Sequence, residues 1–330
     1  MGRGRKGKRG EEKPVPSRLG RGEVPPEFIE YYRAQLVPHS LTEEEFTQML
    51  NLFKVTLPHV FRISPIARDS ASLTADLEKF FDILRENNAL GPEVDFLSHE
   101  YGRIIRLLVD RPALRKTPAL VPFQHFLTQH SEAGDIHRQE LVSMIPPYFL
   151  DVHPDHLVLD MCAAPGSKTS QIIEMMLLKD PNAPGLVVAN DVEPDRCRTL
   201  IHQTQRFGAP HVVVTNYGGQ NFPSVVQFDR VLCDVICSGD GTFRKNTDAA
   251  EKWRLKNALG IHPLQISILK RGLELLKKDD PRLLDLLIES HRRRGCHQFR
   301  AERPQWSSVY RRHQQSLPWT QKKSWAQSLE

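Results

Sequence analysis

No run of about 18 to 20 uninterrupted apolar residues occurs in this sequence, so it lacks the segment that a membrane-spanning helix needs. Its basic N-terminus is not followed by the apolar stretch of a secretory signal. Its cysteines are odd in number and lack paired C-x-x-C spacing, which favours neither a disulfide framework nor a zinc site. We therefore expect an intracellular, soluble, monomeric protein without a bound metal.

Acidic residues are scarce at both ends of the chain. Residues 1–22 carry a net charge of +6 and residues 291–330 carry +7, which leaves −8 for the stretch between them. The N-terminal run MGRGRKGKRG is dense enough in charge to contact nucleic-acid phosphates or to serve as a nuclear localisation signal. We expect the protein in the nucleus or its nucleolus. A disordered, solubilising tail is the alternative interpretation.

Composition divides the chain into four regions. Residues 1–24 hold glycine, proline and charge with almost nothing apolar, and are predicted to be disordered. Residues 25–135 form an accessory region with helical patterns and one strand-like run, HVFRI. Residues 136–282 alternate short apolar strands with helices. Residues 283–330 are basic and show neither helical nor strand periodicity, so disorder is predicted there too.

The helical patterns of the accessory region include LTEEEFTQMLNLF, where Thr42 and Glu45 have the spacing of a capping box. Further helices are predicted over 118–132 and 138–145. Beyond them, strands are predicted at 157–161, 186–190, 211–215 and 230–234, with helices from about 167 and 194 and a last helix over 263–278. Strand alternating with helix predicts a parallel α/β sheet with right-handed crossovers.

The first of these strands runs into a turn of small residues within LVLDMCAAPGSKT, residues 157–169. Ligands of such sheets bind at the carboxyl ends of the strands, and the small side chains of Ala163, Ala164 and Gly166 let the backbone approach one closely. The following helix offers unpaired N–H groups to a carboxylate. Asp191, at the end of the second strand, is placed to accept ribose hydroxyls. S-adenosylmethionine (SAM) has both groups.

Two other nucleotide-binding loops do not fit this segment. A P-loop requires G-x-x-x-x-G-K-[ST], but Ser167 stands where its second glycine belongs. A dinucleotide-binding loop requires G-x-G-x-x-G, and the segment has a single glycine. A tight strand-to-helix turn that binds nothing remains the structural alternative.

A second group of reactive residues follows the fourth predicted strand, in DRVLCDVICSGDGTFRKN. Asp234 and Cys237 lie three residues apart at the carboxyl edge of the sheet. Methylating C5 of cytosine requires a thiolate to add at C6 while an acid engages N3, whereas methylating an exocyclic amine needs no thiol. Simple loop packing is the alternative role for Cys237.

Together these segments resemble the Nop/Sun (RsmB/NOP) family of RNA cytosine-5 methyltransferases, and within it the eukaryotic tRNA enzymes. The matching runs are RQELVSMIPP, DMCAAPGSKT, ANDV and CSGDGTFRKN. The resemblance implies a Rossmann-like SAM-dependent methyltransferase fold and tRNA as partner. It implies catalytic roles for Asp234 and Lys168 at the target base and for Cys237 in product release. The implied cofactor-binding residues are Cys162, Ala163, Ala164, Pro165, Gly166, Ser167, Lys168, Asp191 and Asp234.

The chain departs from that pattern in three places. The third strand of the family ends in Asn-His-Asp, whose acid contacts the adenine, but this chain has Asn216-Tyr217-Gly218. The family's Pro-Cys is here Ile236-Cys237. The Thr-Cys-Ser motif that carries the family's nucleophile is absent from the sequence.

The genetic code suggests an origin for the missing motif. Residues 283–298, LLDLLIESHRRRGCHQ, can be back-translated so that the next reading frame spells YSTCSSNPIEDEAVI. We therefore expect the region from about residue 283 to be out of frame, and the sheet to be incomplete, with strands 1–4 and an exposed fourth strand. The predicted function is SAM-dependent methylation of cytosine C5 in tRNA. The alternative is an inactive fragment that retains SAM or RNA binding.

Overall fold

The computed structural model describes residues 23–37, 39–55, 57–67, 69–92, 94, 102–109, 111–206, 208, 210–277 and 286–288. The predicted disorder of residues 1–22 and of the tail beyond 288 lies outside these residues. The chain forms two compact units. One contains the chain up to Thr56 together with Gly239–Leu255, and the other contains Leu57–Ser238 together with the chain from Lys256. The predicted division at residue 135 differs from this arrangement, because the accessory region contributes to both units.

The first unit is built on helices α1 (Pro26–Leu36) and α2 (Glu43–Leu52), and the returning segment adds α11 (Thr247–Lys252). The capping box predicted at Thr42 is confirmed, since its hydroxyl accepts from the Glu45 N–H while the Glu45 carboxylate accepts from the Thr42 N–H. The aromatic core joins all three segments, with side chains that are at most 2% exposed: Phe28, Phe46, Phe243 and Trp253.

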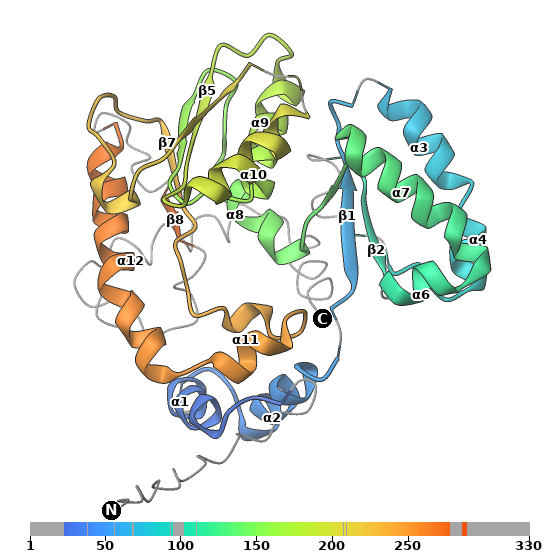
Figure 1. The fold of residues 1–330 in the computed structure, drawn as a ribbon, viewed down its shortest axis with the longest axis horizontal. Coiled ribbons are helices and arrows are strands. Elements are labelled where there is room, and N and C mark those ends of the chain that lie inside the picture. The colour runs from blue at the N-terminus through green and yellow to red at the C-terminus, as the bar shows by residue number, and fades with distance from the viewer. Residues whose placement is uncertain are drawn as a thin grey trace, which may run out of the picture. The chain divides into compact units, whose positions relative to one another are not determined.

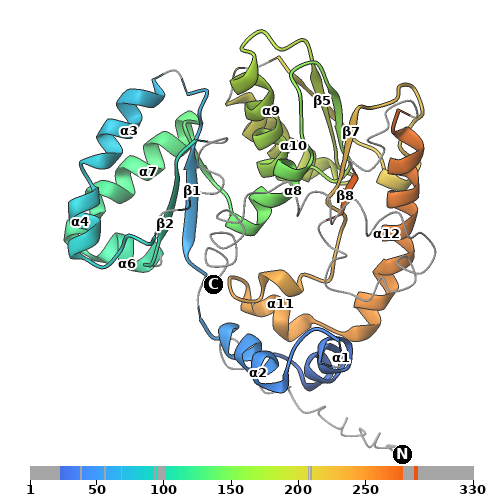
Figure 2. The same cartoon turned by 180° about the vertical axis from the view of Figure 1, so that it is seen from behind.

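The second unit begins with a three-stranded antiparallel sheet of order β2-β1-β3. Its strands are β1 (His59–Ile63), β2 (Ile104–Leu107) and β3 (Ile136–Arg138). Figures 1 and 2 show helices on one side of β1 and β2, among them α3 (Ser70–Glu78), α4 (Phe81–Glu86), α6 (Arg111–Lys116) and α7 (Val121–Ala133).

The sequence predicted β1 correctly, but the helix predicted over 138–145 is wrong. Arg138 belongs to β3, and only a short 3-10 turn (Leu141–Met144) precedes α8 (Ile145–Phe149). The pairing of β3 with β1 supplies the backbone hydrogen bonds that local helical spacing could not reveal. The antiparallel sheet formed by β1, β2 and β3 therefore extends to Arg138, three residues past the predicted end of the accessory region at residue 135.

The second sheet is parallel throughout and has the order β6-β5-β4-β7-β8. Its strands are β4 (Leu157–Asp160), β5 (Leu186–Asn190), β6 (Val212–Thr215), β7 (Arg230–Cys233) and β8 (Leu286–Ile288). The four predicted strands and the parallel α/β fold are confirmed.

The prediction that this sheet ends at its fourth strand is wrong. Strand β8 pairs with β7 in the register Val231 to Leu286, so β7 is an inner strand and the edge lies elsewhere. The short apolar run LLI is sufficient for such pairing, because parallel strands are joined through their backbones. The predicted disorder of residues 283–330 is likewise wrong for 286–288.

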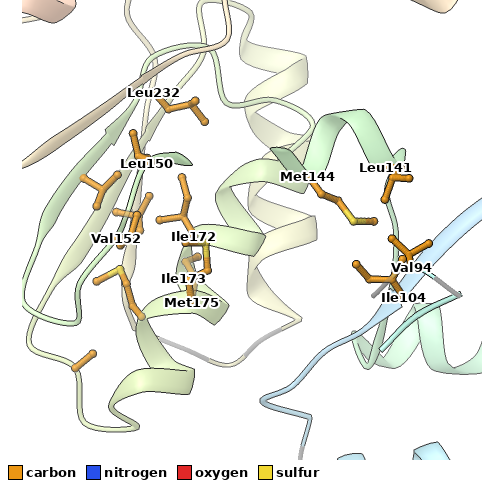
Figure 3. Packing of buried hydrophobic residues seen from close by; sticks show 14 residues of the cluster. Val94, Ile104, Leu141, Met144, Leu150, Val152, Ile172, Ile173, Met175 and Leu232 are labelled. Carbon is orange, nitrogen blue, oxygen red and sulfur yellow. The ribbon is translucent and has the colours of Figure 1, made fainter. Parts of the chain in front are cut away.

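Neighbouring residues of a strand point to opposite faces of the sheet, so an apolar strand presents apolar side chains on both faces. Helices pack on both faces of this parallel sheet. On one face Val158 and Leu232 pack with Ile172 and Ile173 of α9 (Ser167–Lys179), in the cluster drawn in Figure 3. On the other face Leu159 and Val231 pack with α12 (Leu255–Leu275). Helix α10 (Pro194–Gln205) connects β5 to β6.

Helix α12 begins eight residues before the predicted start at Pro263, which lies inside the helix. Proline lacks the N–H that would bond to Leu259, but it does not stop the preceding turns from forming. None of the helices in the part of the chain that the structure describes is both long and apolar enough to span a membrane.

Candidate functional site

The turn between β4 and α9 depends on Gly166. This residue has φ +107° and forms the N-cap of α9, a conformation that favours glycine. A Cβ added to it would lie 2.8 Å from Leu200 Cδ1 of α10. The Gly166 N–H donates to the Ala163 carbonyl over 2.8 Å, and the Ala163 N–H donates to the Asn190 carbonyl over 2.7 Å. The predicted small-residue turn is thus fixed to the end of β5, with the first turn of α9 directly after it.

Asn190 ties three strand ends together from a fully buried position. Its amide donates to the carbonyls of Met161 and Tyr217, over 3.1 and 2.8 Å. Its oxygen accepts from the Thr215 hydroxyl and the Tyr217 N–H, over 3.0 and 2.9 Å. Our sequence analysis did not single out Asn190. The available signal was an amide residue at the end of an otherwise apolar strand, where a buried polar group must find partners.

Asp191 follows Asn190 and is only 2% exposed. Its carboxylate accepts from the N–H groups of Ala164 and Glu193, over 3.2 and 3.1 Å. Arg196 of α10 lies 3.3 Å from the same carboxylate and also donates to the Ala164 carbonyl. In this structure Asp191 holds the turn in place, and its predicted contact with a ribose stays a prediction.

Asp160 ends β4 beneath the turn and is 1% exposed. One of its carboxylate oxygens, Oδ2, accepts from the Thr169 hydroxyl over 2.7 Å. The backbone N–H of Cys162 is a second donor to this carboxyl group. Burial raises the pKa of this carboxyl group to about 7, against the lowering effect of the Thr169 hydroxyl.

Lys168 and Asp234 meet across the carboxyl edge of the sheet. The Lys168 ammonium, in the first turn of α9, lies 2.8 Å from the Asp234 carboxylate at the end of β7. Their side chains are 13% and 29% exposed, so the pair is accessible but largely shielded from water. The structure therefore brings together two of the three predicted catalytic residues, which are far apart in the sequence.

The two cysteines of the predicted site differ in their surroundings. Burial, with the neighbouring carboxylates of Asp160 and Asp191, raises the pKa of the Cys162 thiol to about 12, so it stays protonated near neutral pH. Cys237 is exposed. The turn before it is anchored by Gln265 of α12, whose amide donates to the Ile236 carbonyl over 2.6 Å. Of the two thiols, Cys237 is the one available for chemistry at the surface.

The end of β6 carries Asn216, Tyr217 and Gly218. The Asn216 amide donates to the carbonyls of Asp191 and Val192, over 2.7 and 2.9 Å. Tyr217 is 48% exposed, and its ring packs edge-on against Phe222. This end of the sheet presents an amide and an aromatic ring, and the acid predicted from the family pattern is absent.

The part of the chain that contains this site is similar to known proteins. The family model described as 16S rRNA methyltransferase RsmB/F matches residues 147–284. These residues are similar to that methyltransferase family, which agrees with the predicted resemblance to Nop/Sun-type methyltransferases.

Two curated relatives carry related names. The multisite-specific tRNA:(cytosine-C(5))-methyltransferase trm4b of Schizosaccharomyces pombe is 36% identical over 287 residues, which covers 76% of this chain and 42% of the relative. The Saccharomyces cerevisiae multisite-specific tRNA:(cytosine-C(5))-methyltransferase is 46% identical over 255 residues, covering 72% and 37%. This chain thus spans about two fifths of the length of these relatives.

Solved structures agree on the fold. A methyltransferase homolog protein from Pyrococcus horikoshii superposes with a TM-score of 0.53 at 25% identity, covering 76% of this chain and 69% of the other. The structure of NSun6 from Pyrococcus horikoshii with SFG gives a TM-score of 0.55 at 15% identity, covering 77% and 80%. The Rossmann-like methyltransferase fold predicted for residues 136–282 is confirmed.

Proposed function

We propose that this chain is the methyltransferase part of an RNA cytosine-5 methyltransferase that acts on tRNA. The observation that carries the proposal is the Lys168–Asp234 pair beside the β4–α9 turn. The pair places an acid next to the predicted cofactor loop, three residues before the exposed Cys237. The names of the curated relatives support tRNA cytosine as the substrate.

The residues of the β4–α9 turn fit SAM. The backbone approaches closely at Gly166, and the first N–H groups of α9 suit a carboxylate. When bound, SAM supplies an electrophilic methyl group on a positively charged sulfur. In this proposal the turn from Cys162 to Lys168 holds its methionine part and Asp191 the ribose.

Asp234 is assigned to the target base. Its carboxyl group engages N3 of cytosine, which draws electron density from the ring and favours addition of a thiolate at C6. Lys168 holds Asp234 at the sheet edge and, in the absence of a base, neutralises its charge. Asp234→Asn replaces the carboxyl group with an amide of nearly the same shape, so it tests the acid function without deleting the side chain.

The family resemblance assigns Cys237 to release of the methylated product, a role that requires a second thiol bonded to C6. Because the sequence holds no Thr-Cys-Ser motif to supply that thiol, Cys237 is the exposed thiol among the described residues that would add at C6 in this chain. In that case water takes the proton lost from C5 as the C6–S bond breaks and the thiolate leaves. The absence of that motif favours one other candidate function, a non-catalytic protein that binds SAM or tRNA without transferring methyl.

Transfer of a labelled methyl group from SAM to unmodified tRNA distinguishes these functions. We expect transfer that Asp234→Asn reduces by at least a hundredfold and that Asp195→Asn, an exposed acid on α10, leaves unchanged. SAM binding without transfer would favour the non-catalytic candidate, and equal transfer by Asp234→Asn would remove Asp234 from the mechanism.

We also propose a nuclear location, based on the basic run at residues 1–22. A fluorescent fusion of the full chain, compared with one in which the basic residues of 1–22 are replaced by serine, tests it. Equal distribution of the two fusions would refute the proposal.

A further inference from the structure

The end of strand β6 lies directly beside Asp191. The Asp191 N–H donates to the Thr215 carbonyl over 3.2 Å, and the Asn216 amide donates to the Asp191 carbonyl over 2.7 Å. The sheet order β6-β5-β4 thus places three segments in a row at the carboxyl edge: residues 216–218, Asp191 and the β4–α9 turn. A ligand that binds the turn with one end and Asp191 with its middle has its other end at β6.

SAM is an elongated molecule with this order of groups. In the proposed function its methionine part lies at the β4–α9 turn and its ribose at Asp191. The adenine base is attached to the ribose on the side away from the methionine part. Because β5 lies between β4 and β6, the base then lies at the end of β6, where Tyr217 is 48% exposed and leaves the strand end open to solvent.

Gln220 places its side-chain amide at this end of β6. A Cβ added to Gly218 would lie 3.1 Å from Gln220 Nε2 and 3.2 Å from Gln220 Oε1, closer than most Cβ atoms come to a neighbour. Gly218 has φ −60°, which any residue can adopt, so its backbone does not require glycine. What the glycine provides is space, because a side chain at 218 would displace the Gln220 amide.

The amide of Gln220 is available to a ligand. The residue is partly exposed, and its side chain makes no hydrogen bond within the part of the chain that the structure describes. The Asn216 amide, by contrast, is occupied by the carbonyls of Asp191 and Val192. A side-chain amide offers one acceptor and one donor side by side, and adenine presents the N6 amino group beside a ring-nitrogen acceptor. The two patterns are complementary.

We propose that Gln220 is a cofactor-binding residue that recognises the adenine base of SAM. Its amide oxygen accepts from the N6 amino group, and its amide N–H donates to the neighbouring ring nitrogen. This inference rests on the proposed function, because it assumes SAM as the ligand. Gly218 contributes by leaving the space in which the amide lies.

Calorimetric titration of the full chain with S-adenosylhomocysteine and with S-inosylhomocysteine tests this role. The two ligands differ only in the base, where the second carries a carbonyl oxygen in place of the N6 amino group. We expect Gln220→Ala to weaken S-adenosylhomocysteine by about fivefold or more, since two hydrogen bonds to the base are lost. The matched control is Gln227→Ala, which removes an exposed amide three residues before β7 and should change neither affinity.

Gln220→Glu tests recognition of the base without shortening the side chain. A carboxylate accepts from the N6 amino group but repels the carbonyl oxygen of S-inosylhomocysteine, whereas the amide of Gln220 can turn to donate to that oxygen. We expect Gln220→Glu to prefer S-adenosylhomocysteine by about tenfold or more, and to prefer it more strongly than the unchanged chain does. A residue that only supports the loop would not change the preference between the two bases.

A double variant tests whether position 218 and the Gln220 amide share one place. Gly218→Asp puts a carboxylate where that amide lies, so in the Gln220→Ala background it should restore most of the affinity for S-adenosylhomocysteine. With Gln220 present it should add little, because the two side chains compete for the same space. An equal effect of Gly218→Asp in both backgrounds would contradict the shared place.

The outcomes separate this inference from the proposed function. Binding of S-adenosylhomocysteine that Gln220→Ala leaves unchanged, or a base preference that Gln220→Glu leaves unchanged, overturns the role of Gln220 alone. Failure of the unchanged chain to bind S-adenosylhomocysteine overturns this inference and the proposed function together. Binding that depends on Gln220, without methyl transfer to tRNA, overturns the proposed function alone.

Discussion

At the residue scale, Gly166 illustrates how one position controls the cofactor loop. Replacing it with alanine forces a side chain into a left-handed conformation and against Leu200. We expect Gly166→Ala to lower the free energy of unfolding by about 1–3 kcal/mol and to weaken SAM binding more than stability alone explains. Denaturant unfolding and calorimetry measure the two effects.

Gly260 provides the matched control for that substitution. It lies within α12, and a Cβ added there meets nothing within 4 Å. Gly260→Ala should therefore stabilise the protein by about 0.5–1 kcal/mol, because alanine loses less backbone entropy than glycine in a helix. If both alanine variants changed stability alike, the conformation assigned to Gly166 would be incorrect.

The contrast between the two cysteines of the site predicts an order of labelling. Cys237 is exposed, while the pKa of Cys162 is raised to about 12 by burial and nearby carboxylates. Iodoacetamide at pH 7.5 should modify Cys237 well before Cys162, as followed by mass spectrometry of the peptides. Faster labelling of Cys162 would show that it is more exposed or more acidic than its surroundings imply.

Single residues also show which structural roles could be predicted from the sequence. The roles of Gly166 and of the Thr42 cap follow from local rules of backbone geometry, and both were predictable. The bonds of Asn190 were not, because they depend on which strand ends become neighbours. The pairing of Lys168 with Asp234 was predictable only through the family resemblance.

At the scale of elements, a buried ion pair joins strand β1 of the antiparallel sheet to helix α9. Arg62 of β1 is fully buried and bonds to Glu174 of α9, which is 2% exposed. Arg62 also donates to Gln139, which in turn donates to Gln171 of α9 over 2.8 Å. The antiparallel sheet thus holds helix α9, whose first turn forms part of the predicted cofactor loop.

Breaking this pair from one side should be costly. We expect Arg62→Met to lower the free energy of unfolding by about 3–5 kcal/mol, because Glu174 is left buried without its partner. The double variant Arg62→Met with Glu174→Met removes both charges and should recover much of the loss. Urea unfolding measures both, and equal destabilisation by the single and double variants would contradict the pairing.

The first unit depends on a polar contact within its aromatic core. Asp240, just after the Cys237 turn, accepts from the Tyr32 hydroxyl and from Trp253 Nε1, the latter over 3.1 Å. Tyr32→Phe should increase hydrogen exchange in the peptides covering 239–255, because a bond to a charged acceptor contributes about 1.5–3 kcal/mol. Tyr31→Phe, on the same helix, should leave the exchange unchanged. Equal exchange in the two variants would show that Tyr32 does not anchor the segment.

Elements predicted well were those with a strong local pattern, and the errors have physical causes. Strands β4, β5 and β7 are short apolar runs that end in polar residues, and the pattern predicted each of them. Strand β2 was not predicted, although it has as many residues as β4 and β7. Strand β8 was missed because the absence of the Thr-Cys-Ser motif led to a prediction of disorder for residues 283–330. The structure of residues 286–288 is decided by backbone pairing with β7.

At the scale of the whole molecule, the discontinuous unit was beyond the reach of the sequence. Gly239–Leu255 folds with α1 and α2 although nearly 200 residues separate them. No local rule connects Phe28 with Phe243 and Trp253, whose rings pack at 5.3 and 5.2 Å from it. The parallel sheet, by contrast, followed from the alternation of strand and helix.

The measurement that tests the central claim most directly is the identity of the methylated nucleoside. Unmodified tRNA is incubated with the purified chain and SAM, digested to nucleosides and examined by mass spectrometry against standards. The chemistry assigned to Asp234 and Cys237 predicts 5-methylcytidine that disappears in Asp234→Asn. Detection of N4-methylcytidine, of a methylated purine, or of no methylated nucleoside at all would contradict it.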